Sequence, residues 1–243
     1  MMKRLIIMIF ASVCLTVAAR GTYETTALKA ARFFEAREWA SAQALYGLML
    51  DERPDADSIY VNAIVASGML GDSIASSHFL SEAMEAGLSF DKLMAGIRSV
   101  SFEVGAPEVY EDFLLRSQRD CPWLSRAIDS ELLDYYLFRD NGRQSIVYAR
   151  KMLAGLPDSR LYLGKLAQGY VLAADYASAI KLWQEMLDLD PDDYDTLIDI
   201  GNYMAITGEH KIAEEYLAHA YSLHPTPYVA SVIASLAAER KNK

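Results

Sequence analysis

Apolar residues recur every three or four positions along most of the chain, which is the spacing of one face of an α-helix. Between residues 157 and 191 this pattern predicts two helices, over about 161–173 and 176–189, joined by a short turn. The same helix–turn–helix pattern returns before and after this stretch. Because one helix pair cannot bury its apolar face alone, we expect successive pairs to stack into a right-handed superhelix.

Five of the seven prolines give the length of this repeat: Pro54, Pro122, Pro157, Pro191 and Pro225. Their steps are 68, 35, 34 and 34 residues, and the first step is twice 34 with Leu88 at its midpoint. The sequence therefore predicts six repeats that end near residues 54, 88, 122, 157, 191 and 225. An apolar pattern over 228–240 predicts one more helix, which caps the last repeat.

Two aligned positions carry most of the structural information. The residue twelve before each repeat end is mostly small, as a close helix crossing requires: Ala42, Ser76, Tyr110, Ser145, Ala179 and Ala213. The residue seventeen before each end falls in the predicted turn, where glycine ends a helix in a left-handed conformation without steric cost. That position holds Arg37, Gly71, Gly105, Asp140, Ala174 and Gly208.

Residues 160–225 resemble two tandem tetratricopeptide repeats. The matching residues are Leu166, Ala167, Tyr170, Tyr176, Ala179, Trp183, Pro191, Ile200, Gly201, Gly208, Ala213, Ala220 and Pro225. The resemblance implies an all-α solenoid of about six helix pairs plus the C-terminal cap, over residues 20–243. It also implies that the first helix of each pair lines the concave face.

Residues 1–19 have the pattern of a secretory signal peptide. Lys3 and Arg4 precede an apolar stretch over 5–15, and Val17 and Ala19 supply the small residues of a cleavage site. The apolar stretch is shorter than the roughly 20 residues that a membrane helix needs. We expect an exported, periplasmic protein, with membrane contact only if the N-terminus is lipidated or anchored. An uncleaved anchor and a lipoprotein carrying lipid on Cys14 are the alternatives.

Charge and cysteine content exclude several classes of partner. The net charge is −10, and loss of the two cations in 1–19 would make it −12. A surface this acidic repels nucleic-acid phosphates and anionic lipid. Without Cys14, Cys121 is the remaining cysteine, so no intramolecular disulfide is expected.

No pattern in the sequence predicts catalysis, a cofactor, a metal site or a small-molecule substrate. Asp188, Asp190, Asp192 and Asp199 imitate a calcium loop, but Asp193 occupies the position that needs glycine. We interpret them as an ordinary repeat end, in which acids favour the start of the next helix. The four histidines lack the spacing that would place two ligands on one helical face.

The first helices supply a candidate peptide-binding surface. A polar residue lies twenty-three positions before the end of each of the last four repeats, and we predict that these residues form a polar file: Ser99, Asp134, Gln168 and Asn202. Leu137 and Val171 offer apolar contact beside it. Such a surface suits an extended or helical peptide. The sequence thus predicts a non-enzymatic protein-binding scaffold, or alternatively a structural subunit of an envelope assembly that uses its convex or lateral face.

We predict cleavage after Ala19, because Val17 and Ala19 satisfy the small-residue rule of signal peptidases. N-terminal sequencing of the protein purified from its host should find Arg20 as the first residue. A chain that begins at Met1, or at a lipidated Cys14, would contradict this expectation.

Overall fold

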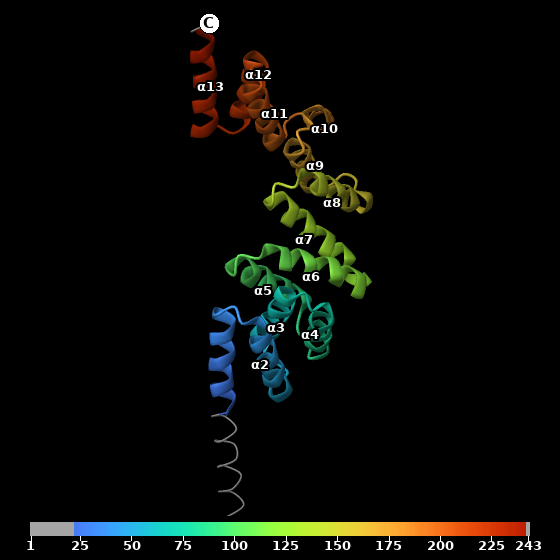
Figure 1. The fold of residues 1–243 in the computed structure, drawn as a ribbon. Coiled ribbons are helices and arrows are strands. Elements are labelled where there is room, and N and C mark those ends of the chain that lie inside the picture. The colour runs from blue at the N-terminus through green and yellow to red at the C-terminus, as the bar shows by residue number, and fades with distance from the viewer. Residues whose placement is uncertain (1–21, 242–243) are drawn as a thin grey trace, which may run out of the picture. The chain divides into compact units, whose positions relative to one another are not determined.

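The computed structural model describes residues 22–241, and every regular element within that range is a helix. The predicted all-α repeat solenoid is therefore confirmed (Figure 1). The predicted signal peptide, 1–19, lies outside the described residues. Among residues 22–241, no helix combines the length and apolar character that crossing a membrane requires.

The helices follow one another in pairs joined by short turns. The pairs are residues 22–35 with α2 (Trp39–Glu52), α3 (Asp57–Leu70) with α4 (Ser73–Glu85), α5 (Phe90–Glu103) with α6 (Pro107–Asp120), α7 (Ser125–Phe138) with α8 (Gly142–Gly155), α9 (Arg160–Leu172) with α10 (Tyr176–Leu189), and α11 (Tyr194–Ile206) with α12 (His210–Leu223). A short 3₁₀ helix, η1 (Pro122–Leu124), precedes α7, and α13 (Pro227–Lys241) ends the series. The predicted six pairs and C-terminal helix are thus present.

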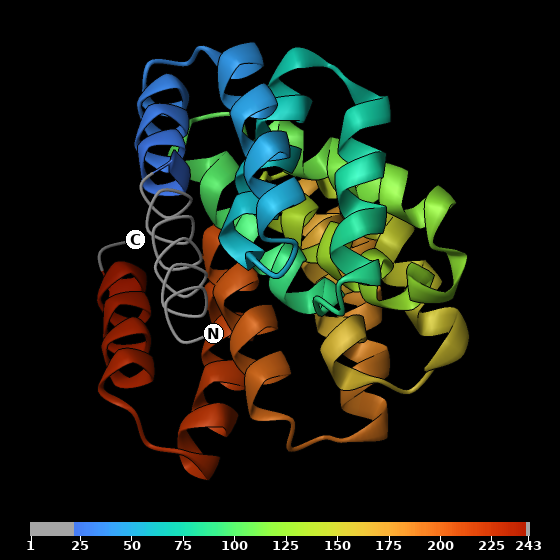
Figure 2. The same ribbon diagram turned by 90° about the horizontal axis from the view of Figure 1, so that it is seen from below.

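The chain divides into two compact units within α7, after Ile128. In the N-terminal unit, α3 packs against both α2 and α4. In the C-terminal unit, α12 packs against both α11 and α13 (orange to red in Figure 2). The sequence predicted one repeat domain with a right-handed superhelix over 20–243, and that continuity stays a prediction.

Each helix pair is reversed by one left-handed residue at the same aligned position. All six residues there have positive φ: Arg37 (60°), Gly71 (69°), Gly105 (74°), Asp140 (52°), Ala174 (57°) and Gly208 (87°). In every turn the next amide donates to the carbonyl five residues earlier, at 2.8 to 2.9 Å. This bond satisfies a carbonyl that the end of the first helix leaves without a partner.

The same turns also start the second helix of several pairs. The side chains of Asp72, Asn141 and Asp175, each directly after the left-handed residue, accept a hydrogen bond from the amide three residues on. Such an N-cap satisfies one of the free amides at a helix start. One left-handed residue and the residue after it therefore end one helix and begin the next.

Close crossings bury the predicted small-residue position. All six of its residues are at most 5% exposed, including the large Tyr110. In the C-terminal unit, α8 and α9 approach so closely that a Cβ on Gly142 would lie 2.3 Å from the Ala173 nitrogen. Contacts this close leave no room for a larger side chain, so packing fixes how successive pairs meet.

We predict that Ala174→Gly stabilises the chain by about 0.5–1 kcal/mol, because glycine adopts the left-handed conformation without the Cβ clash that alanine suffers. The matched control is Ala173→Gly, whose residue has φ −82°, and it should destabilise by a similar amount. Urea denaturation midpoints of both variants provide the measurement. A lower midpoint for Ala174→Gly would contradict the left-handed turn.

Candidate functional site

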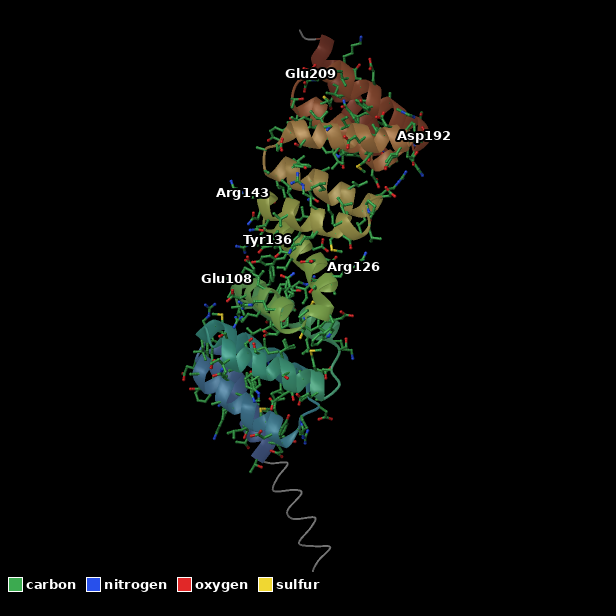
Figure 3. All side chains as sticks on the ribbon, turned by 90° about the vertical axis from the view of Figure 1, so that its right-hand side faces the viewer. Glu108, Arg126, Tyr136, Arg143, Asp192 and Glu209 are labelled. Atoms are coloured by element: carbon green, nitrogen blue, oxygen red, sulfur yellow. The ribbon has the colours of Figure 1, made fainter. Side chains whose placement is uncertain are left out.

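The C-terminal unit contains an open groove between the first helices α9 and α11, with α10 beneath it. Its volume is about 650 Å³. The lining residues are Arg160, Leu161, Gly164, Lys165, Gln168, Val171, Trp183, Met186, Asp193, Asp195, Thr196, Asp199, Asn202, Tyr203 and Ile206. Asp192 precedes α11 and Glu209 follows it, and both are labelled in Figure 3.

Three of the residues predicted from the sequence line this groove. Gln168 and Val171 come from α9, and Asn202 comes from α11. The oxygen of the Asn202 side chain accepts a hydrogen bond from the Tyr228 hydroxyl at 3.2 Å, which leaves its amide nitrogen available to donate. The two amides therefore stand where the aligned positions predict a polar file.

The other three predicted residues have different surroundings. The Asp134 carboxylate is paired with the ammonium of Lys165, so it holds a groove residue without lining the groove itself. Leu137 is only 9% exposed and offers little surface to a partner. Ser99 is exposed on α5, in the N-terminal unit.

The groove has apolar walls that the sequence analysis did not single out. Leu161 is 61% exposed and Ile206 is 84% exposed, whereas Trp183 and Met186 form a buried floor. The Tyr203 ring packs on Trp183, with their centroids 6.0 Å apart. In the sequence, Leu161 and Ile206 are aliphatic residues at helix ends. Helical periodicity alone does not show whether such residues are exposed or belong to the core.

The cations of the groove are already neutralised. The Arg160 guanidinium donates a hydrogen bond to the Asp190 carboxylate and lies 3.4 Å from that of Asp193. The hydrogen bond from Arg160 holds the pKa of Asp190 below its usual value. Lys165 is paired with Asp134. A negatively charged ligand would therefore compete with carboxylates of the protein for either cation.

Two carboxylates of the groove have no such partner. Within the described chain no cation lies within ion-pair distance of Asp195 or Asp199, which are one turn apart on α11. Partial desolvation, followed by the negative charges of Asp195 and Asp193, raises the pKa of the Asp199 carboxyl. The groove thus presents uncompensated negative charge beside apolar walls.

A smaller hollow of about 410 Å³ occupies the corresponding face of the N-terminal unit. Ala31 and Phe34, at the aligned positions of Gln168 and Val171, line it. Its cation, Arg37, donates to the Val104 carbonyl at 3.3 Å, and the Phe34 ring meets Trp39 edge-on at 5.1 Å. These internal contacts occupy much of its surface, so the groove of the C-terminal unit is the stronger candidate.

The features that imitate other chemistry have structural roles. Asp190 is held by Arg160, and Asp192 lies 2.8 Å from the His219 ring nitrogen. Between residues 22 and 241, no group of three or more potential ligands is placed to hold a metal ion. Cys121 is buried, and desolvation together with the charge of Asp120 raises the pKa of its thiol, which disfavours the reactive thiolate.

Comparisons with known proteins return similar structures only. No model of a protein family matches the chain, and no curated protein matches it. The C-terminal part of a TPR repeat-containing protein from Cytophaga hutchinsonii has 14% identity, a TM-score of 0.48, and coverage of 80% of this chain and 78% of that one. The structure of pilF of Pseudomonas aeruginosa has 12% identity and a TM-score of 0.44, and the match covers 89% of this chain and 97% of that one.

A third similar structure is the TPR2AB domain of yeast Sti1 in a complex with pHSP90. Its identity is 12% and its TM-score 0.39, with 88% of this chain and 99% of that chain covered. Similarities this distant do not decide function. The functional argument therefore rests on the groove itself.

Proposed function

We propose that this protein is a non-enzymatic interaction scaffold that binds a segment of a partner protein in the groove between α9 and α11. The observation that carries the proposal is the exposure of Leu161 and Ile206 on the walls of an open groove. Apolar side chains exposed in a concavity favour a ligand that covers them, because covering them removes apolar surface from water.

Polar groups in the same groove would orient such a ligand. The Gln168 and Asn202 amides can donate to and accept from a peptide backbone, which is what an extended or helical segment requires. A peptide therefore finds both apolar contact and backbone partners here.

Export to the periplasm is part of the same proposal. It rests on the signal-like pattern of Lys3, Arg4, Val17 and Ala19. The partner would then be another envelope protein, and neither a cofactor nor a small-molecule substrate is invoked.

Gly164 provides a direct test of the groove. It lines the groove, and a Cβ built on it would meet no atom within 4 Å, so a side chain added there starts in open space. We predict that Gly164→Trp weakens partner capture about tenfold or more, which corresponds to roughly 1.4 kcal/mol. Replacing a helical glycine should leave stability unchanged or slightly higher.

Gly164→Ala is the matched control, because a methyl group leaves the groove open. Proteins captured from envelope extract by the wild type and both variants would be quantified by mass spectrometry. A specific partner should be retained by Gly164→Ala and lost with Gly164→Trp. Equal capture by all three proteins would refute groove binding and favour assembly through the convex or lateral face.

A further inference from the structure

The unpaired carboxylates of α11 distinguish this groove from a neutral peptide-binding surface. Asp195 and Asp199 lie on the same wall as Asn202, Tyr203 and Ile206. Like charges one helical turn apart repel each other, and no cation of the described chain offsets them. A positive group placed between them would relieve this repulsion.

The remaining charges of the groove do not compete for that role. The Arg160 guanidinium serves two carboxylates, Asp190 and Asp193, and Lys165 serves Asp134. An acidic ligand would have to share either cation with a carboxylate of the protein and would then face Asp195 and Asp199. Charge complementarity therefore selects against acidic segments and in favour of basic ones.

We propose that the groove selects a basic amphipathic segment of its partner, in which a lysine or arginine pairs with Asp195 and Asp199 while neighbouring apolar side chains cover Leu161 and Ile206. This inference rests on the proposed function and adds the chemistry of the partner. The long stem of a lysine or arginine packs against apolar surface while its charged end reaches a carboxylate. Such residues suit a groove in which Tyr203 lies one turn after Asp199 on α11.

The raised pKa of Asp199 agrees with this assignment. Its carboxyl is partly desolvated and next to Asp195, so its charged form is disfavoured in the free protein. A bound cation would favour the charged form again. The acidic wall thus gains more from a cationic ligand than a fully solvated pair of carboxylates would.

Random peptides displayed on phage and selected on the full chain are the probe. We predict that enriched peptides combine lysine or arginine with aliphatic or aromatic residues. Synthetic copies should bind Asp195→Asn/Asp199→Asn about tenfold more weakly than the wild type, because the substitutions keep the shape of the wall and remove its charge. Their affinity for the wild type should also fall as ionic strength rises.

Asp188→Asn/Glu215→Gln is the matched control. It removes the same charge from exposed residues of the second helices α10 and α12, outside the groove, and should bind the peptides as the wild type does. Thermal unfolding of both double variants would verify that each is folded. A loss of binding confined to Asp195→Asn/Asp199→Asn supports the proposal.

Two results would overturn it and are distinguishable from each other. If enriched peptides show no excess of basic residues, or bind Asp195→Asn/Asp199→Asn as tightly as the wild type, the charge preference falls. Groove binding then still stands if the same peptides no longer bind Gly164→Trp. If they bind Gly164→Trp and Asp195→Asn/Asp199→Asn as tightly as the wild type, the charge preference and groove binding both fall.

Discussion

The left-handed residue between the two helices of each pair is the constraint on which the rest of the structure depends. It occurs at one aligned position in all six pairs, and in three of them it is not glycine. Arg37 and Ala174 adopt a conformation that costs a residue with a Cβ about 1 kcal/mol, and Asp140 tolerates it more readily. The repeated geometry persists there because the hydrogen bond across the turn and the buried crossing that follows it both require the chain to reverse at that residue.

The groove is a consequence of that repeated reversal. Each turn returns the chain so that the second helix of a pair packs behind the first, and α10 thereby lies beneath both α9 and α11. Its Trp183 and Met186 close the floor, and the two first helices become walls. The side chains that face the groove need no role in the core, so they can be exposed, charged or apolar according to what the groove binds.

Much of this was predictable from the sequence, since the repeat length and turn position follow from proline spacing and helical periodicity. Gln168, Val171 and Asn202 were found because they share aligned positions on first helices. Leu137 holds the aligned position of Val171 but is buried, because exposure depends on what packs around each repeat. Its burial could therefore not be predicted from alignment.

The charges of the groove were harder to predict. The Lys165–Asp134 and Arg160–Asp190 pairs join residues about thirty positions apart, and helical periodicity gives no information on such contacts. In the sequence, Asp195 and Asp199 are spaced like the acids of any solvent-exposed helix face. Only the structure shows that the nearby cations are already occupied, which leaves these two carboxylates available to a partner.

The central claim is that the groove between α9 and α11 is the binding surface. Nuclear magnetic resonance on the full chain tests this claim most directly. Amide chemical shifts would be followed while a phage-selected basic peptide is titrated into the protein. The account predicts that the largest changes fall within 160–171 and 195–206. Changes confined to the outer faces of α10 and α12, or to residues 22–128, would contradict it.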